Sequence, residues 1–131
     1  MGLDTSEKMI EISKKRYPKN QYLLLDILVD KNKIPIVDYI VINGIFTQKG
    51  TYSNKKMFQF LKSVLTIVAK KARLGIAFNV FSNIVDWKNK GNYYLDFKII
   101  TDFIGKKISK NFIINHHYGL HEYTIYIYKK V

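Results

Sequence analysis

The order of hydrophobic patterns along the chain constrains its fold more than any other feature. Helical patterns, with apolar residues every three or four positions, alternate with short apolar runs rich in β-branched residues. Near the C-terminus two strand patterns follow each other, separated only by residues 117–121. Such close strands pair antiparallel, because a parallel return needs a crossover of about a dozen residues. We therefore expect an α/β fold: a Rossmann-like, doubly wound, mainly parallel sheet with helices on both faces and a C-terminal antiparallel β-hairpin.

The same patterns give the expected element boundaries. Strands are predicted over residues 1–4, 21–28, 37–45, 75–81, 111–116 and 123–128. Helices are predicted over residues 5–16, 54–72 and 94–108. Thr5 and Ser6 are suitable caps for the first helix, and Pro18 ends it because the residue before a proline avoids the α region. Loops are expected over residues 46–53 and 82–92.

Length and composition narrow the class of protein. The 131 residues match one ordinary domain, and we expect a single domain over residues 1–131. With no cysteine, a disulfide scaffold and a thiolate metal site are excluded. No apolar run reaches the roughly 18 residues of a membrane span, and the N-terminal pattern carries acids, unlike a signal peptide. We expect a cytoplasmic protein.

The formal net charge of +12 raises the possibility of a nucleic-acid partner. Only Arg16 and Arg73 among the 22 basic residues are arginines, although arginine forks supply much of the specificity of nucleic-acid recognition. The lysines are scattered in ones and twos, as on a solvated surface. The sequence therefore disfavours nucleic acid as the partner.

Ligands of doubly wound sheets bind beyond the carboxyl ends of the strands. The residues at the expected strand ends are Asp4, Asp26 with Ile27, Asn43 with Gly44, and Ser82 with Asn83. A carboxylate such as Asp4 can accept hydrogen bonds from both hydroxyls of a ribose, and Asp26 can accept one from an adenine amine beside the apolar wall of Ile27. Each acid also has a purely structural alternative, as a helix cap or a strand-end turn residue.

Residues 2–10, GLDTSEKMI, followed by KKRYP at 14–18, resemble the second-strand region of class I S-adenosylmethionine-dependent methyltransferases, with its pattern G-[ILV]-D-x-S-x-x-M-[IL]. Residues 37–46, VDYIVINGIF, and 118–128, YGLHEYTIYIY, resemble a bacterial subgroup often linked to surface-glycan or small-molecule modification. The resemblance covers the chain from Gly2 onward. It implies S-adenosylmethionine as cofactor, held by Asp4, Asp26, Ile27, Asn43 and Gly44.

The chain departs from the family at its start. The family carries a glycine-rich loop about twenty residues before the ribose-binding acid, whereas three residues precede Asp4, and none of the seven glycines forms G-x-G-x-x-G. We therefore expect a truncated domain with impaired cofactor binding, without the family's first strand. In the family's strand order, 3-2-1-4-5-7-6, we expect the gap to lie between the strands at Gln21 and Val37. Unpaired edges there predict a homodimer, with or without exchanged elements.

Methyl transfer needs a base that takes a proton from the acceptor's hydroxyl or amine. The candidates are His116, His117 and His121, which flank the hairpin turn, and the acid Glu122. The histidines also fit the role of plain turn and strand-end residues, and we expect no metal site. The aromatic residues expected to rim the substrate pocket, unless they are ordinary packing residues, are Phe46, Tyr52, Trp87, Tyr93, Tyr94 and Tyr118.

Three hypotheses follow. The first is an S-adenosylmethionine-dependent methyltransferase acting on a hydroxyl or amine of a small molecule or sugar. The second is a non-catalytic, dimerising remnant of the same fold. The third is a basic nucleic-acid-binding domain, whose affinity would fall steeply with salt.

Overall fold

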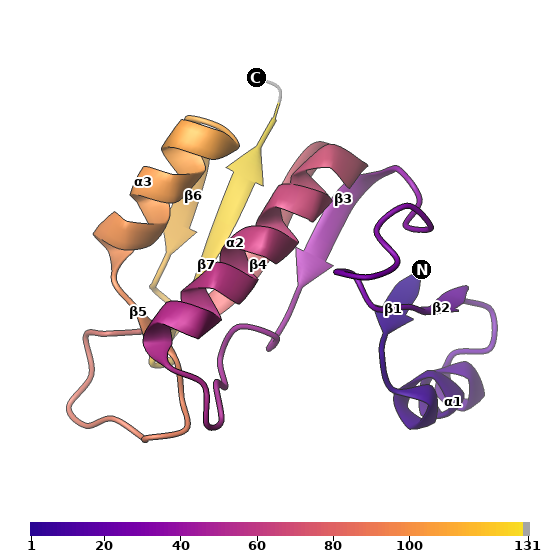
Figure 1. Cartoon of the computed structure of the whole chain (residues 1–131), viewed down its shortest axis with the longest axis horizontal. Coiled ribbons are helices and arrows are strands. Elements are labelled where there is room, and N and C mark those ends of the chain that lie inside the picture. Colours follow the sequence, from indigo (N-terminus) through magenta and orange to yellow (C-terminus); the bar gives the residue numbers. More distant parts are fainter. Residues whose placement is uncertain (130–131) are drawn as a thin grey trace. The chain divides into compact units, whose positions relative to one another are not determined.

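A computed structural model of the protein describes residues 1–129 (Figure 1). The chain divides into two compact units, Met1–Pro35 and Ile36–Val131. The expectation of a single domain over residues 1–131 stays a prediction.

The first unit is a strand–helix–strand element. It contains β1 (Gly2–Asp4), α1 (Glu7–Arg16) and β2 (Tyr22–Leu24), and the two strands pair in parallel with Asp4 opposite Leu24. The helix begins as the sequence predicts, because the Ser6 side chain accepts a hydrogen bond from the Met9 N–H at 3.3 Å. The Tyr22 hydroxyl lies 3.1 Å from carbonyl oxygens near the end of α1 and ties the helix to β2.

The predicted strand over residues 21–28 is too long. Beyond Leu24 the chain turns: Asp26 Oδ1 accepts a hydrogen bond from the Leu28 N–H at 2.8 Å, and Asp26 O accepts one from the Asp30 N–H at 2.7 Å. Asp30 Oδ2 in turn accepts the Asp26 N–H at 3.1 Å. Aspartate side chains that bond neighbouring backbone groups compete with strand pairing, and here they end the strand early.

The second unit is built on a mixed sheet. Its strands lie in the order β3 (Val37–Ile42), β4 (Ala72–Ser82), β7 (Glu122–Tyr128) and β6 (Asn111–Asn115), and the short β5 (Tyr94–Leu95) pairs with the end of β4. The β3–β4 and β4–β5 pairs are parallel, whereas β7 runs antiparallel to both β4 and β6. The predicted C-terminal hairpin is confirmed, and its last strand is inserted between β4 and β6.

Two helices accompany this sheet, α2 (Asn54–Lys71) and α3 (Phe97–Lys107). Ser53 caps α2 by accepting the Lys56 N–H at 3.1 Å. Residues 94–95, predicted to be helical, instead form β5, because Asp96 starts α3 by accepting the Lys98 N–H at 2.8 Å. The helices bury an apolar stripe; in α2 its members are Met57, Leu61, Val64, Leu65 and Val68.

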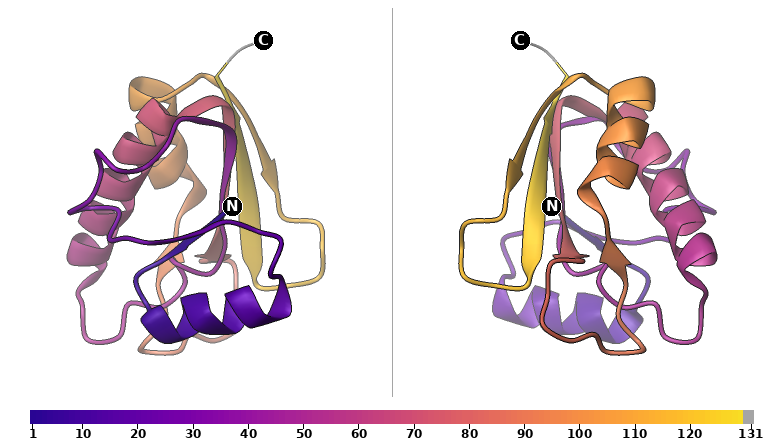
Figure 2. Two further views of the ribbon diagram at one scale, coloured as in Figure 1. Left: turned by 90° about the vertical axis from the view of Figure 1, so that its right-hand side faces the viewer. Right: turned by 90° about the vertical axis from the view of Figure 1, so that its left-hand side faces the viewer.

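Both helices cover the same face of the sheet (Figure 2). Ile76, Phe78 and Ile125 of that face are at most 3% exposed and form the core with the helices. On the opposite face Tyr39 and Val41 are 62% and 74% exposed. The expectation of helices on both faces is therefore wrong for this sheet, because each connection between its strands that contains a helix leads to the same side. We call the uncovered side the open face.

The expected gap between the strands at Gln21 and Val37 stays a prediction. β2 pairs in parallel with β1, and β3 pairs in parallel with β4; within residues 1–129 these two pairs belong to separate sheets.

Candidate functional site

A buried amide connects the strand ends of the second unit. Asn79, on the open face of β4, is 8% exposed. Its Oδ1 accepts a hydrogen bond from the Gly44 N–H at 2.8 Å, and its Nδ2 donates one to Glu122 Oε2 at 3.1 Å. One side chain therefore joins the turn after β3 to the start of β7.

The turn after β3 requires glycine. Gly44 has a φ of +76°, in the left-handed region that other residues adopt with strain. The Thr47 hydroxyl closes the turn by donating to Gly44 O at 2.9 Å. This conformation aims the Gly44 N–H at Asn79, so the backbone of one strand end orients the side chain of its neighbour.

A tyrosine–threonine pair lies next to this amide. The Tyr118 and Thr124 hydroxyl oxygens are 3.1 Å apart, and Thr124 stands opposite Asn79 in the β4–β7 register. Burial, with the negative charge of Glu122 adding to it, raises the pKa of Tyr118 above its usual value, so its hydroxyl stays protonated near neutral pH. The group named here the Asn79 cluster consists of Gly44, Asn79, Tyr118, Glu122 and Thr124.

The histidines have contacts that match their alternative role as turn and strand-end residues. The His116 ring packs edge-on against Phe97 and Tyr123, with centroids 5.7 and 6.2 Å apart. His117 is exposed, and its N–H donates to Asn115 Oδ1 at 3.0 Å. The structure brings neither into the Asn79 cluster, and their assignment as catalytic bases stays a prediction.

The expected rim of aromatic residues divides into buried and exposed members. Phe46 is fully buried, with its ring edge-to-face against Phe60 and Phe78, so it is a core residue rather than part of a pocket rim. Tyr93 is also buried, and burial raises its pKa to about 12. Tyr52 and Trp87 lie on loops and are 58% and 65% exposed, as rim residues would be.

The side chains of Ser82 and Asn83, at the end of β4, form hydrogen bonds within the chain. Ser82 is fully buried and its hydroxyl oxygen accepts the Ile84 N–H at 3.0 Å. Asn83 Nδ2 donates to Asp96 Oδ2 at 3.0 Å, which links this strand end to the cap of α3.

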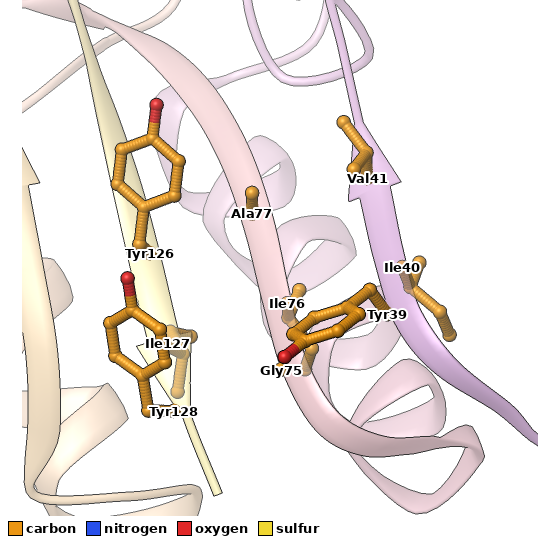
Figure 3. Close-up of a pocket in the computed structure, with 9 residues that line it drawn as sticks. All are labelled: Tyr39, Ile40, Val41, Gly75, Ile76, Ala77, Tyr126, Ile127 and Tyr128. Carbon is orange, nitrogen blue, oxygen red and sulfur yellow. The ribbon is translucent and has the colours of Figure 1, made fainter.

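The open face also carries a groove of about 230 Å³ (Figure 3). Gly75 and Ala77 of β4 form its floor, and larger side chains of β3 and β7 rise on its two sides. Those side chains are Tyr39, Val41, Tyr126 and Tyr128. All nine lining residues are uncharged. Sequence reasoning missed this groove, although the alternation of YTIYIY at 123–128 signals two different faces.

In the first unit, Asp4 is the last residue of β1 and Asp26 follows the parallel strand β2, so both lie toward the carboxyl ends of the two strands. Asp4 Oδ1 accepts the Ser6 N–H and Asp26 Oδ1 the Leu28 N–H, both at 2.8 Å. A carboxylate offers about four acceptor positions, so each group retains the capacity to receive the hydroxyls of a ribose or the amine of an adenine. Ile27, next to Asp26 in the chain, is half-buried.

Among residues 1–129, no group of three or more histidine, cysteine or acidic side chains is placed to hold a metal ion. No helix there has the length and apolarity needed to cross a membrane.

Comparisons with known proteins agree with this fold. No protein-family model matches the sequence. The chain is 25% identical over 132 residues to a Mycobacterium tuberculosis protein named "Putative methyltransferase Rv1506c", an alignment that covers 98% of this chain and 77% of that protein.

Two solved structures are similar in fold. Magnesium protoporphyrin IX methyltransferase (ChlM) from Synechocystis PCC 6803 aligns with a TM-score of 0.65 and 12% identity in its complex with SAM, and with 0.70 and 11% in its complex with SAH. Both alignments cover 98% of this chain, which spans only 58% and 63% of the respective ChlM chains. The sequence relative is named a putative methyltransferase, and the shared fold is that of a methyltransferase, in agreement with the resemblance of residues 2–10 to class I S-adenosylmethionine-dependent methyltransferases.

Proposed function

We propose that the protein takes part in S-adenosylmethionine-dependent methyl transfer to a hydroxyl or amine of a small molecule or sugar. The observation that carries this proposal is the pair of carboxylates, Asp4 and Asp26, toward the carboxyl ends of two parallel strands in a chain with a methyltransferase fold. The cofactor would supply a methyl group bound to a positively charged sulfur.

The residues of each unit have distinct roles in this proposal. In the first unit Asp4 accepts hydrogen bonds from the ribose hydroxyls, and Asp26 accepts one from the adenine amine beside Ile27. Asn43 and Gly44 as cofactor contacts remain predictions from the sequence. Tyr52, Trp87 and Tyr118 are proposed to contact the methyl acceptor.

Calorimetric titration with S-adenosylmethionine and with S-adenosylhomocysteine tests the proposal. We expect dissociation constants below about 1 mM, that is, more than about 4 kcal/mol of binding free energy. Asp4→Asn should weaken binding about tenfold or more, because it removes the charge and keeps an oxygen for the Ser6 N–H. Glu11→Gln, at an exposed site on α1, is the matched control. Binding weaker than 1 mM, or equal binding by both variants, would contradict the proposal.

A homodimer is part of the proposal. Within residues 1–129, β3 pairs with β4 alone, and an unpaired strand edge is a template for another chain. Light scattering after size-exclusion chromatography should give twice the chain mass of 15.4 kDa. A monomer at every concentration tested would remove this part of the proposal and leave cofactor binding untouched. A cytoplasmic location stays a prediction.

A further inference from the structure

We propose that the Glu122 carboxylate accepts a hydrogen bond from the N–H or O–H group of the methyl acceptor. Asn79 is then the positioning residue that orients the Glu122 carboxylate. This inference rests on the proposed methyl transfer for the fate of the proton. Its binding test does not depend on the cofactor.

Asn79 is fixed at both ends. The residue is 8% exposed, and its Oδ1 accepts the Gly44 N–H. Because the amide is planar, that bond determines where the Nδ2 hydrogens point, and one of them is directed at Glu122 Oε2. The turn at Gly44 therefore restricts the orientation of the Glu122 carboxylate through a single rigid group.

Glu122 keeps capacity for a ligand. Its side chain is half-buried, and after the bond from Asn79 the carboxylate retains acceptor positions on both oxygens. It pairs with Phe81 near the carboxyl end of β4. The turn after β3 lies at the same end of the sheet, because β3 and β4 are parallel. Among the base candidates from the sequence, Glu122 is joined to these strand ends by its side chain, whereas the His116 ring packs against aromatic residues.

The chemistry of a carboxylate selects the class of acceptor. An ionised carboxylate only accepts hydrogen bonds, so it recognises a group that carries N–H or O–H and does not recognise an ether. As the acceptor's nitrogen or oxygen bonds to the methyl carbon, the carbon–sulfur bond breaks and its electron pair stays on sulfur. The proton released by the acceptor passes to Glu122. We therefore infer an acceptor with a hydroxyl or an N–H amine.

Three probes that share one apolar body test this recognition by NMR. Benzylamine and benzyl alcohol each carry a donor, and benzyl methyl ether does not. We expect the first two to shift the side-chain amide signals of Asn79 in a saturable way, and the ether to bind at least about tenfold more weakly. Equal shifts by all three probes, or no shift at Asn79 up to about 100 mM, would overturn the proposal.

A double-mutant cycle separates positioning from simple structural support. Glu122→Gln keeps the shape of the side chain and should lower benzylamine affinity about tenfold, whereas the control Glu11→Gln should not. Asn79→Leu should lower it by a similar factor in the wild-type background and have no further effect in the Glu122→Gln background. Additive effects, or full affinity in Glu122→Gln, would refute the mechanism. Because Glu122→Gln leaves the buried amide in place, it tests the site even where Asn79→Leu fails to fold.

Titration of Glu122→Gln with S-adenosylmethionine distinguishes this inference from the proposed function. We expect the cofactor affinity of Glu122→Gln to equal that of the wild type, and its turnover with benzylamine to fall at least tenfold with an unchanged KM for S-adenosylmethionine. Undetectable cofactor binding by the wild type would contradict the proposed function, while loss of probe binding in Glu122→Gln would still support this site. Undiminished turnover in Glu122→Gln would remove Glu122 as the proton acceptor.

Discussion

Gly75→Ala should destabilise the second unit because two neighbours occupy the space of a methyl group. A Cβ atom at this position would lie 2.8 Å from the Ile127 carbonyl oxygen and 3.3 Å from the Tyr39 ring. The carbonyl belongs to the paired strand β7, so it cannot move without disturbing the ladder between β4 and β7. Gly75 thus allows the Tyr39 ring to rest against the floor of the groove (Figure 3).

Two opposing effects set the magnitude. Overpacking of this kind lowers the free energy of unfolding by about 1–3 kcal/mol. Replacing glycine also restricts the unfolded chain, which raises that free energy by about 0.4–1 kcal/mol. We therefore expect a net loss of about 1–2 kcal/mol in the free energy of unfolding. For a unit of this size, each kcal/mol lowers the melting temperature by about 4–8 °C. Urea denaturation followed by circular dichroism measures the free energy, and a thermal scan measures the temperature.

Gly105→Ala is the matched control. Gly105 lies within α3. Apart from its two chain neighbours and the nearby backbone of its own helix, no heavy atom would lie within 4 Å of an added Cβ. Because glycine is a poor helix former, this substitution should raise the free energy of unfolding by up to about 1 kcal/mol. A Gly75→Ala protein as stable as the wild type, alongside a stabilised Gly105→Ala protein, would refute the argument that close contact requires glycine in β4.

Further predictions concern two buried tyrosines. The fully buried Tyr123 hydroxyl donates to Leu95 O at 2.9 Å, so Tyr123→Phe should cost about 1–3 kcal/mol by urea denaturation, and a cost near zero would show that this bond adds nothing. Burial raises the pKa of Tyr93 from 10.0 to about 12, so the folded protein retains a proton that the unfolded chain loses in this range. The associated stability is fully present below pH 10 and declines as the pH rises through about 12. Denaturation series across this range should show a smaller decline for Tyr93→Phe than for the wild type, and an equal decline would contradict the assignment.

The sequence predicted the elements whose signals are local. Ser6 and Ser53 cap their helices as their residue type and position suggest, and the long apolar stripe after Asn54 forms α2. Errors arose where a side chain competes with the backbone. Asp26 ends β2 through its own turn, and Asp96 moves the start of α3 beyond β5. Apolar periodicity alone does not report such bonds.

The site was less accessible to sequence reasoning because its members come together only through the sheet. Glu122 was a candidate base, but Asn79 was missed, although it is a polar residue within the apolar run GIAFNVF at 75–81. Its function depends on Gly44, 35 positions earlier, and on Glu122, 43 positions later. Phe46 was expected on the rim of a pocket because it lies in a loop. Its side chain instead turns inward and joins the core, which the sequence pattern does not report.

The placement of the basic residues argues against nucleic acid as the partner. Basic side chains occupy the last turn of each helix, where they interact favourably with the helix dipole. The groove on the open face is lined by uncharged residues, so the positive charge is not gathered in this groove. A nucleic-acid site needs basic residues concentrated on one face or along one helix. We expect no saturable binding to a 20-base-pair DNA duplex at about 50 mM salt by fluorescence anisotropy, where electrostatic binding is strong. Tight binding there that falls steeply with added salt would instead show that these lysines form a phosphate-binding surface.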